Sequence, residues 1–451
     1  MSNLSSDPEG LKAAAKHVLM RAKTYGATSA DVLVSYGRHQ GITIRASVLE
    51  DIDNSEGREL GLRVMIGHRQ ACVSSSDLSA DVLDQLAERA VAMARLAPED
   101  PYCGLAPPER LFQSGEDLDL FDPTDFTPQD LQKRALRIEA AALSIKGVSQ
   151  AEGAHASQAM SRSCFMTSAG FAKELQSSHH DHGVAAYAAN DDMMERDFKF
   201  SRHRWFSELL APEDVGRIAG ERAVARLGAR QIESGHMPII FGRRVANHLI
   251  ESLMSAVSGP SITRGMSFLK DKLGTAIFPR SIQIKDDPLI KRGYASRLWD
   301  GEGVASTPMN IIKDGVLETW LLNMASARQL DMESTGHGFR PLSAAPGVST
   351  SNVYMQAGTL SPAQLGRETG EGLWVGEMFG PSLNMNTGDY SVGVAGFKLE
   401  AGARTYPVSE ITIAGNLLDM FATITPADDL IFDKAVAIPT LRVEGMTVAG
   451  T

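Results

Sequence analysis

The N-terminal part of the chain contains two apolar runs in close succession, Leu60-Gly-Leu-Arg-Val-Met-Ile-Gly-His-Arg-Gln-Ala-Cys-Val-Ser74. Residues 60–66 and 70–74 are short apolar runs of the kind that predicts strands. Only three residues, Gly67-His68-Arg69, separate the two runs. A connection this short favours a β-hairpin.

Elements on both sides of this hairpin complete a first unit. Residues 31–35 and 41–45 predict two more strands. Residues 11–25 carry apolar side chains at helical spacing, and Ser79 is a candidate N-cap for a helix with Val82, Leu86, Ala90 and Met93 on one side. We therefore predict an α+β unit over residues 1–97.

A connector and a second unit follow. Residues 98–127 are rich in proline and acids, which favours either a linker or an ordered crossover along the surface. Thr127 and Pro128 then predict the start of a helix. Residues 128–230 contain short strands and a closing helix at 215–227, whose Ala-rich pattern resembles that of the helix after Ser79. A duplicated unit is one explanation.

The third part, residues 235–451, predicts a large β-rich domain. A strand at 237–241 precedes a helix at 243–257, and Ile311-Ile-Lys-Asp-Gly-Val-Leu317 predicts a hairpin with an Asp-Gly turn. The predicted fold class is therefore α+β, with an N-terminal half of two small sheet-plus-helix units followed by the β-rich C-terminal domain.

Composition excludes several classes of protein. The 451 residues carry a net charge of −11 and no Lys/Arg block, which argues against nucleic acid as a partner. Residues 1–10 have no secretory-signal pattern, and no apolar run is long enough for a membrane span. Cys72, Cys103 and Cys164 form no CxxC pair, so we expect free thiols in the cytoplasm.

Candidate chemical sites are few. The sequence has no HExxH, no HExxxH, no G-x-S-x-G elbow and no P-loop. His179-His180-Asp181-His182 is the most metal-like run, because His180 and His182 would share one face of a strand. A polar turn or strand edge that is rich in histidine is the plainer explanation, because no third ligand cluster is evident.

Two further segments contain histidine. On the helix at 243–257, His248 and Glu251 lie on a narrow polar stripe, where they could share a metal or pair with each other. Ser334-Thr-Gly-His337-Gly-Phe-Arg340 is a polar, glycine-flanked loop that could line a binding surface or form a tight turn.

An ordered series of motifs resembles the PmbA/TldE side of the TldD/PmbA metallopeptidase family, also called modulators of DNA gyrase. The motifs span nearly the whole chain: Gly26-Ala-Thr-Ser-Ala-Asp-Val32, residues 74–79, residues 195–201, residues 267–279, Asp300-Gly-Glu-Gly-Val304, residues 311–315, Ser334-Thr-Gly-His337, Thr387-Gly-Asp-Tyr-Ser391, residues 395–397 and residues 406–417.

The resemblance implies a division of labour between two chains. In this family a TldD-type chain holds zinc through HExxxH and a later cysteine, and it pairs with a TldE-type chain to cleave unstructured peptides, such as microcin-type precursors and an antitoxin. Here the zinc-helix positions correspond to Glu251, Ser252 and Ala256, and no cysteine follows Cys164. The resemblance therefore implies no catalytic or metal-binding residue and no cofactor in this chain, with zinc expected in the partner.

Three hypotheses follow for the function. The leading one is a non-catalytic TldE-like subunit that pairs with a TldD-type chain and forms a homodimer when alone. Its candidate substrate or interface residues are His248, His337, Asp389, Tyr390 and Asn416, and strands between residues 384 and 416 are the expected contact. The alternatives are an independent metallopeptidase with an unrecognised site, for example at His179–His182, and a direct modulator of DNA gyrase.

Overall fold

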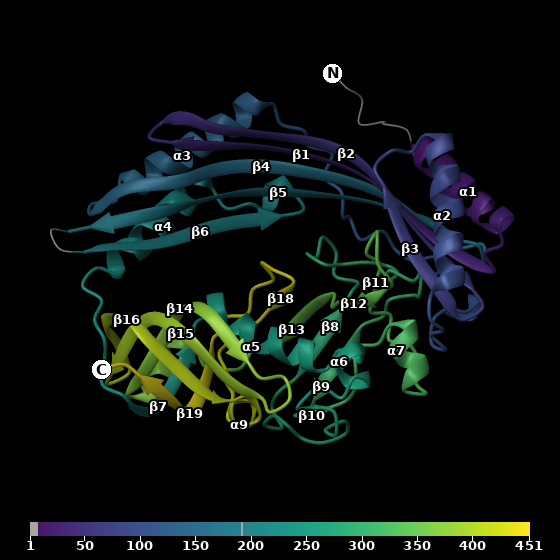
Figure 1. Cartoon of the computed structure of the whole chain (residues 1–451). Helices are drawn as coiled ribbons and strands as arrows, with labels where there is room; N and C mark the ends of the chain where they lie inside the picture. Colours follow the sequence, from purple (N-terminus) through teal and green to yellow (C-terminus); the bar gives the residue numbers. More distant parts are fainter. Residues whose placement is uncertain (1–7, 191–192) are drawn as a thin grey trace.

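The computed structural model describes residues 8–190 and 193–451, and its N-terminal half is built on one six-stranded sheet (Figure 1). The strand order is β3-β2-β1-β4-β5-β6, so the two predicted units meet where β1 pairs with β4. This antiparallel pairing runs from Asp31 opposite Thr167 to Ile44 opposite Ala154. The two predicted units therefore share a single continuous sheet.

Both units have the same order of elements, helix, three strands and helix. The first consists of α1 (Pro8–Tyr25), β1 (Ser29–Arg45), β2 (Val48–Ile66), β3 (Arg69–Ser75) and α2 (Ala80–Leu96). The second consists of α3 (Pro128–Leu143), β4 (Val148–Thr167), β5 (Ala172–Ala189), β6 (Met194–His203) and α4 (Pro212–Ala225). The repeated order, mirrored across the β1–β4 pair, fits the duplication suggested by the two similar helices.

All four helices cover the same face of this sheet. Alternate residues of β1 point to that face: Val32 and Val34 pack with α1 and α2, while Ile42 and Ile44 pack with α3 and α4. The other face lies toward the C-terminal domain (Figure 1). Gly61 shows how close this approach is, because a Cβ there would lie 2.1 Å from the carbonyl oxygen of Leu342.

The predicted helix starts differ in detail. Thr127 caps α3 with a complete capping box, in which its side chain accepts from the backbone N–H of Asp130, and Pro128 occupies the first turn. Ser79 is also the N-cap of α2, but its side chain makes no capping hydrogen bond. The prediction for Ser79 is therefore correct in position and wrong in mechanism.

The proline-rich segment is an ordered crossover. It contains one short 3₁₀ helix, Pro108–Arg110, and otherwise runs without a helix or named strand between the sheet and the C-terminal domain. Its backbone bonds both: Phe112 N donates to Gly303 O over 2.9 Å, and Ser178 N donates to Leu120 O over 3.0 Å. The segment thus ties the two halves together.

The C-terminal domain is β-rich, as predicted, and contains two larger sheets. The first has the order β16-β15-β14-β7-β19-β17 and closes on itself, because β16 also pairs with β19. The second has the order β10-β9-β8-β13-β18. The hairpin of β9 and β10 has the predicted Asp314-Gly315 turn, and both residues have positive φ, 49° and 78°.

The bounds of these elements are as follows. The strands are β7 (Gly235–Phe241), β8 (Ile284–Asp287), β9 (Met309–Lys313), β10 (Val316–Leu317), β11 (Gly338–Phe339), β12 (Gly347–Val348), β13 (Asn352–Met355), β14 (Gly372–Leu383), β15 (Asp389–Glu400), β16 (Ala403–Asn416), β17 (Thr425–Pro426), β18 (Val436–Ala437) and β19 (Leu441–Ala449). The helices are α5 (Arg243–Ala256), α6 (Gly259–Thr263), α7 (Met324–Gln329), α8 (Pro362–Thr369) and α9 (Leu417–Ala422).

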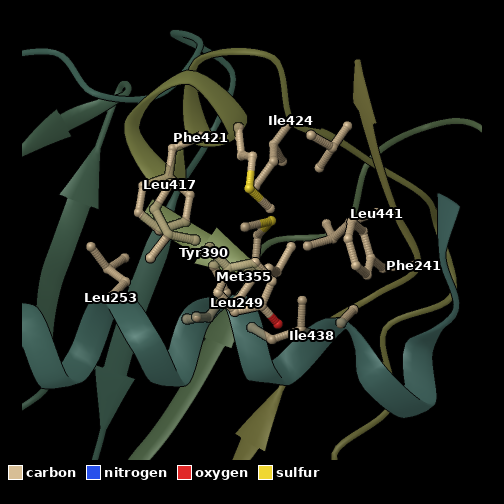
Figure 2. Close-up of a cluster of buried hydrophobic side chains, with 14 of the residues drawn as sticks. Phe241, Leu249, Leu253, Met355, Tyr390, Leu417, Phe421, Ile424, Ile438 and Leu441 are labelled. Carbon is tan, nitrogen blue, oxygen red and sulfur yellow. The ribbon is translucent and has the colours of Figure 1, made fainter. Parts of the chain in front are cut away.

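Helix α5 lies in the core of this domain. Its apolar residues, among them Leu249 and Leu253, pack against side chains from both sheets and from α9. Figure 2 shows Leu249 and Leu253 facing Tyr390, Leu417 and Phe421. The apolar stripe predicted for this helix is therefore buried, and only its polar side reaches the surface.

The contact expected between residues 384 and 416 is limited by this architecture. Strand β15 is paired on both sides, by β14 and β16. Within residues 384–416, strand addition is therefore limited to the other edge of β16, which β19 pairs only over Thr412–Ala414. In the described part of the chain, no helix has the length and apolarity that crossing a membrane requires. Residues 1–7, part of the segment without a predicted secretory signal, lie outside the described residues.

Candidate functional site

The polar side of α5 is the position that the family resemblance assigns to a zinc helix. His248 and Glu251 are both partly exposed there, at 43% and 45% of their side chains, and His248 Nδ1 lies 3.2 Å from Glu251 Oε2. Asn247 Nδ2 donates to Glu251 Oε1 over 2.8 Å. The contacts with His248 and Asn247 lower the pKa of Glu251, so this carboxylate is already engaged by neighbours on its own helix.

The donor set of α5 does not fit a zinc centre. Zinc takes three or four ligands from His, Cys, Asp and Glu. Ser252 instead donates its hydroxyl to the carbonyl oxygen of His248 over 2.9 Å, and Ala256 is fully buried and has no donor atom. Within residues 8–190 and 193–451, no group of three or more His, Cys, Asp or Glu side chains is placed to hold a metal ion.

His337 lies in a buried polar cluster of the C-terminal domain. Its Nε2 is 3.2 Å from Asp286 Oδ2, and its Nδ1 is 2.9 Å from the hydroxyl of Thr335. Asp286 also accepts from the backbone N–H of Ser351 over 2.9 Å. His337 and Asp286 are 3% and 1% exposed, which does not fit a direct contact between His337 and a peptide.

The three candidates at residues 389–416 separate into a surface pair and a core residue. Asn416 caps α9 and donates to Asp389 Oδ1 over 3.1 Å, at the exposed end of β15. Tyr390 is 3% exposed and points into the core (Figure 2). Asp389 and Asn416 are accessible to a partner chain, whereas Tyr390 is not.

The histidines of β5 alternate as strand geometry predicts. His180 and His182 are buried on the helix-covered face: His180 Nε2 lies 3.3 Å from Asp122 Oδ2, and His182 Nδ1 lies 2.9 Å from Arg134 Nη1. The expected turn or strand edge is wrong, because β5 runs between β4 and β6. Burial, reinforced by Arg134, lowers the pKa of His182 to about 3.

Two buried charge clusters near the domain junction were not predicted. Asp31, fully buried on β1, accepts from Arg63 Nε over 2.6 Å and from Arg340 Nε over 2.7 Å. The alternation in β1 was a signal for Asp31, since this acid occupies the strand face opposite that of Val32. Asp300 and Glu302, from the Asp-Gly-Glu-Gly motif, form the second cluster.

The carboxyls of Asp300 and Glu302 differ in their hydrogen bonds. Asp300 accepts backbone N–H groups from Glu302, Val304 and Gly338, at 2.8, 3.0 and 2.7 Å. Glu302 accepts one, from Met324, at 2.7 Å. Burial and the neighbouring Asp300 raise the pKa of Glu302 to about 8, so the fold favours the protonated form of this carboxyl.

Comparison with known proteins places this architecture in a family. Residues 30–94, 121–227 and 234–450 match the family models of the PmbA/TldA metallopeptidase domain 1, central domain and C-terminal domain. The Metalloprotease PmbA of Escherichia coli O157:H7 is 35% identical over 423 residues, which cover 93% of this chain and 92% of that protein.

Solved structures have the same fold. A protein named as a candidate modulator of DNA gyrase from Bacteroides thetaiotaomicron superposes with a TM-score of 0.90 at 23% identity, over 98% of this chain and 99% of that chain. TldE from Thermococcus kodakarensis superposes with a TM-score of 0.85 at 18% identity, over 97% and 100%. Since the three family models together with the Escherichia coli relative span nearly the whole sequence, this chain belongs to the PmbA/TldD metallopeptidase family.

Proposed function

We propose that this chain is the non-catalytic, TldE-like subunit of a two-chain zinc peptidase. Its TldD-type partner would hold the zinc ion and cleave unstructured peptides, such as microcin-type precursors or an antitoxin, in the cytoplasm. The observation that carries the proposal is the chemistry of α5, whose Glu251, Ser252 and Ala256 stand at the expected zinc-helix positions.

Metal-assisted hydrolysis needs an open metal position and a base that can take a proton from water. Ser252 occupies the position of the base, and its hydroxyl is already used on the carbonyl oxygen of His248. Glu251 is hydrogen-bonded by Asn247 and paired with His248. Glu251 and Ser252 thus each have a partner within α5, and Ala256 has no donor atom, which supports a non-catalytic role for this helix.

An unpaired strand edge on the C-terminal domain supports a role in holding a peptide. Strand β14 pairs with β7 only over residues 373–375, and beyond Val375 it pairs with β15 alone among the described strands. Phe379 on this segment is 50% exposed. An unpaired strand edge beside an exposed aromatic ring suits an extended peptide, which can bind by strand addition.

A hollow on the sheet face away from the helices provides further room. It encloses about 510 Å³ and is lined by residues of β1, β2, β4 and β5, including Ser35, His39 and His179. Such a cavity would guide or cover a peptide between the two chains.

Co-purification with the TldD-type chain of the same organism tests the proposal. We expect a stable heteromeric complex with zinc in the partner, and a homodimer without stoichiometric zinc when this chain is purified alone. Glu251→Gln should leave the zinc content and the peptidase activity of the complex intact. Zinc bound by this chain alone and lost in Glu251→Gln would contradict the proposal.

A further inference from the structure

A basic cavity lies between the N-terminal sheet and the start of α5. It encloses about 380 Å³ between β6, α4, α5 and the segment before β18. Six cationic side chains line it: Lys199, Arg202, Arg222, Arg243, Arg244 and Lys434. Only two carboxylates, Asp181 and Asp433, face them in the lining. The excess of positive charge is unusual for a chain whose net charge is −11.

Half of these cations have a carboxylate partner. Arg243 Nη1 lies 2.8 Å from Asp433 Oδ2, and Arg244 pairs with Asp197 outside the cavity. Arg202 lies 3.7 Å from Asp181, although that carboxylate is bound more closely, at 2.7 Å, by His155. The two acids of the cavity are thus already used.

The other three cations, Lys199, Arg222 and Lys434, form no ion pair with any carboxylate in the described part of the chain. Lys434 Nζ donates to Asn247 Oδ1 over 2.9 Å and to the carbonyl oxygens of Arg243 and Arg244 over 3.3 Å each. Arg222 donates to the carbonyl oxygen of Phe198 over 3.4 Å. Burial lowers the pKa of Lys199, and the neighbouring Arg222 lowers it further. Positive charges this close repel one another, so each raises the electrostatic free energy of the others unless an anion lies between them.

The start of α5 adds to the positive potential. The N-terminus of a helix carries a partial positive charge, which acidic residues in the first turn usually offset. The first turn of α5 has no acidic residue, and it begins instead with Arg243 and Arg244. The helix therefore increases the attraction of the cavity for an anion.

Aromatic rings form part of the same lining. Phe198 and Phe200 lie with ring centroids 5.0 Å apart, and Tyr294 lines the cavity as well. Cations beside apolar rings suit a ligand that carries both carboxylates and apolar groups. An acidic peptide segment has this character, and the cavity is far larger than one inorganic anion requires.

We propose that the basic cavity binds a carboxylate-bearing segment of a peptide, through an acidic side chain or the C-terminal carboxylate. This inference rests on the proposed function and deepens it, because it names the class of peptide that this subunit holds. Lys199 and Arg222 supply unpaired charges, and Phe198 and Phe200 supply apolar contact. Lys434 adds positive potential only, because its three N–H donors are already engaged.

Direct binding of short labelled peptides to the full chain tests this inference. One peptide contains several Asp and Glu residues, and its control has Asn and Gln at the same positions. We expect the acidic peptide to bind at least about tenfold more tightly than its control, since charge-assisted hydrogen bonds are the stronger class. Lys199→Gln combined with Arg222→Gln should weaken that binding about tenfold or more.

A matched variant separates the cavity from general electrostatics. Arg137→Gln combined with Lys133→Gln removes the same net charge from two surface ion pairs elsewhere, with Glu213 and Asp130. This control variant should still bind the acidic peptide. Lys199→Arg, which retains the positive charge, should bind it as well. Equal losses in both double variants, or equal binding of the two peptides, would overturn the inference. Circular dichroism checks that every variant is folded.

The proposed function can fail separately from this inference. The complex with the TldD-type chain is given the neutral control peptide, whose cleavage does not require the basic cavity. Cleavage of that peptide together with equal binding of both peptides would refute the cavity's role alone. An inactive complex would refute the proposed function, whatever the chain binds.

Discussion

Arg340 Nε donates to Asp31 Oδ1 over 2.7 Å, and this buried contact joins the C-terminal domain to the first strand of the N-terminal sheet. Arg63 Nε donates to the other carboxylate oxygen over 2.6 Å. Asp31 thus compensates two buried guanidinium groups from two parts of the chain. This carboxylate therefore helps to join the two domains, together with contacts such as the hydrogen bonds of Arg204 to the carbonyl oxygens of Gly293 and Tyr294.

Asp31→Asn is therefore expected to destabilise the protein strongly. It keeps the shape of the side chain but leaves two buried arginines without a counter-charge, which costs about 3–5 kcal/mol. The free energy of unfolding in urea measures the loss. Asp84→Asn is the control, because Asp84 pairs with His17 and Arg21 near the surface and should cost less than about 1 kcal/mol. Similar losses for both variants would contradict this account of the junction.

Glu302 should make the protein less stable as the pH rises. Its pKa is about 8 in the folded chain, against 4.5 as the ordinary value. Between these values the unfolded chain releases a proton that the folded chain retains, so stability is full below about pH 4.5 and falls toward pH 8, by up to about 1.4 kcal/mol per pH unit. Glu302→Gln should flatten this slope. Parallel stability curves for the two proteins would show that Glu302 is ionised when folded.

His182 should make the protein less stable as the pH falls. Burial, with Arg134 beside it, lowers the pKa of His182 to about 3 from 6.5. As the pH falls below 6.5 the unfolded chain takes up a proton that the folded chain refuses, so stability is lost toward pH 3. His182→Gln should show a shallower loss on acidification, and it should run parallel to the wild type above about pH 7. An unchanged acidic slope would contradict the prediction.

Tyr390→Phe should be neutral or stabilising. The Tyr390 hydroxyl is buried with no hydrogen-bond partner among the described residues, and burial raises its pKa. Removing an unsatisfied hydroxyl while keeping the ring should change the free energy of unfolding by between zero and a gain of about 1 kcal/mol. Tyr390→Ala, which leaves a cavity, should cost about 3–5 kcal/mol. A loss of more than about 1 kcal/mol in Tyr390→Phe would indicate a partner for the hydroxyl.

Local patterns in the sequence predicted the local structure well. The Asp314-Gly315 turn, the Thr127 cap and the apolar stripe of α5 each depend on residues only a few positions apart. The period of two along a strand also placed His180 and His182 on one face. These features are fixed by backbone geometry that neighbouring residues set themselves.

Long-range arrangements could not be predicted in the same way. Pairing of β1 with β4 joins residues more than a hundred positions apart, such as Asp31 and Thr167, and no local pattern specifies that register. The basic cavity likewise combines Lys199, Arg222 and Lys434 from separate elements. We expected His337 and Tyr390 to contact a substrate or partner because they lie in glycine-rich segments, but the tertiary packing buries both.

Peptide cleavage by the TldD-type chain, measured with and without this chain under the same conditions, tests the central claim most directly. The account predicts little cleavage by either chain alone and full cleavage by the two together, although this chain contributes no metal ligand. Full activity of the TldD-type chain alone would contradict a subunit role for this protein. Zinc-dependent cleavage by this chain alone would contradict its description as non-catalytic.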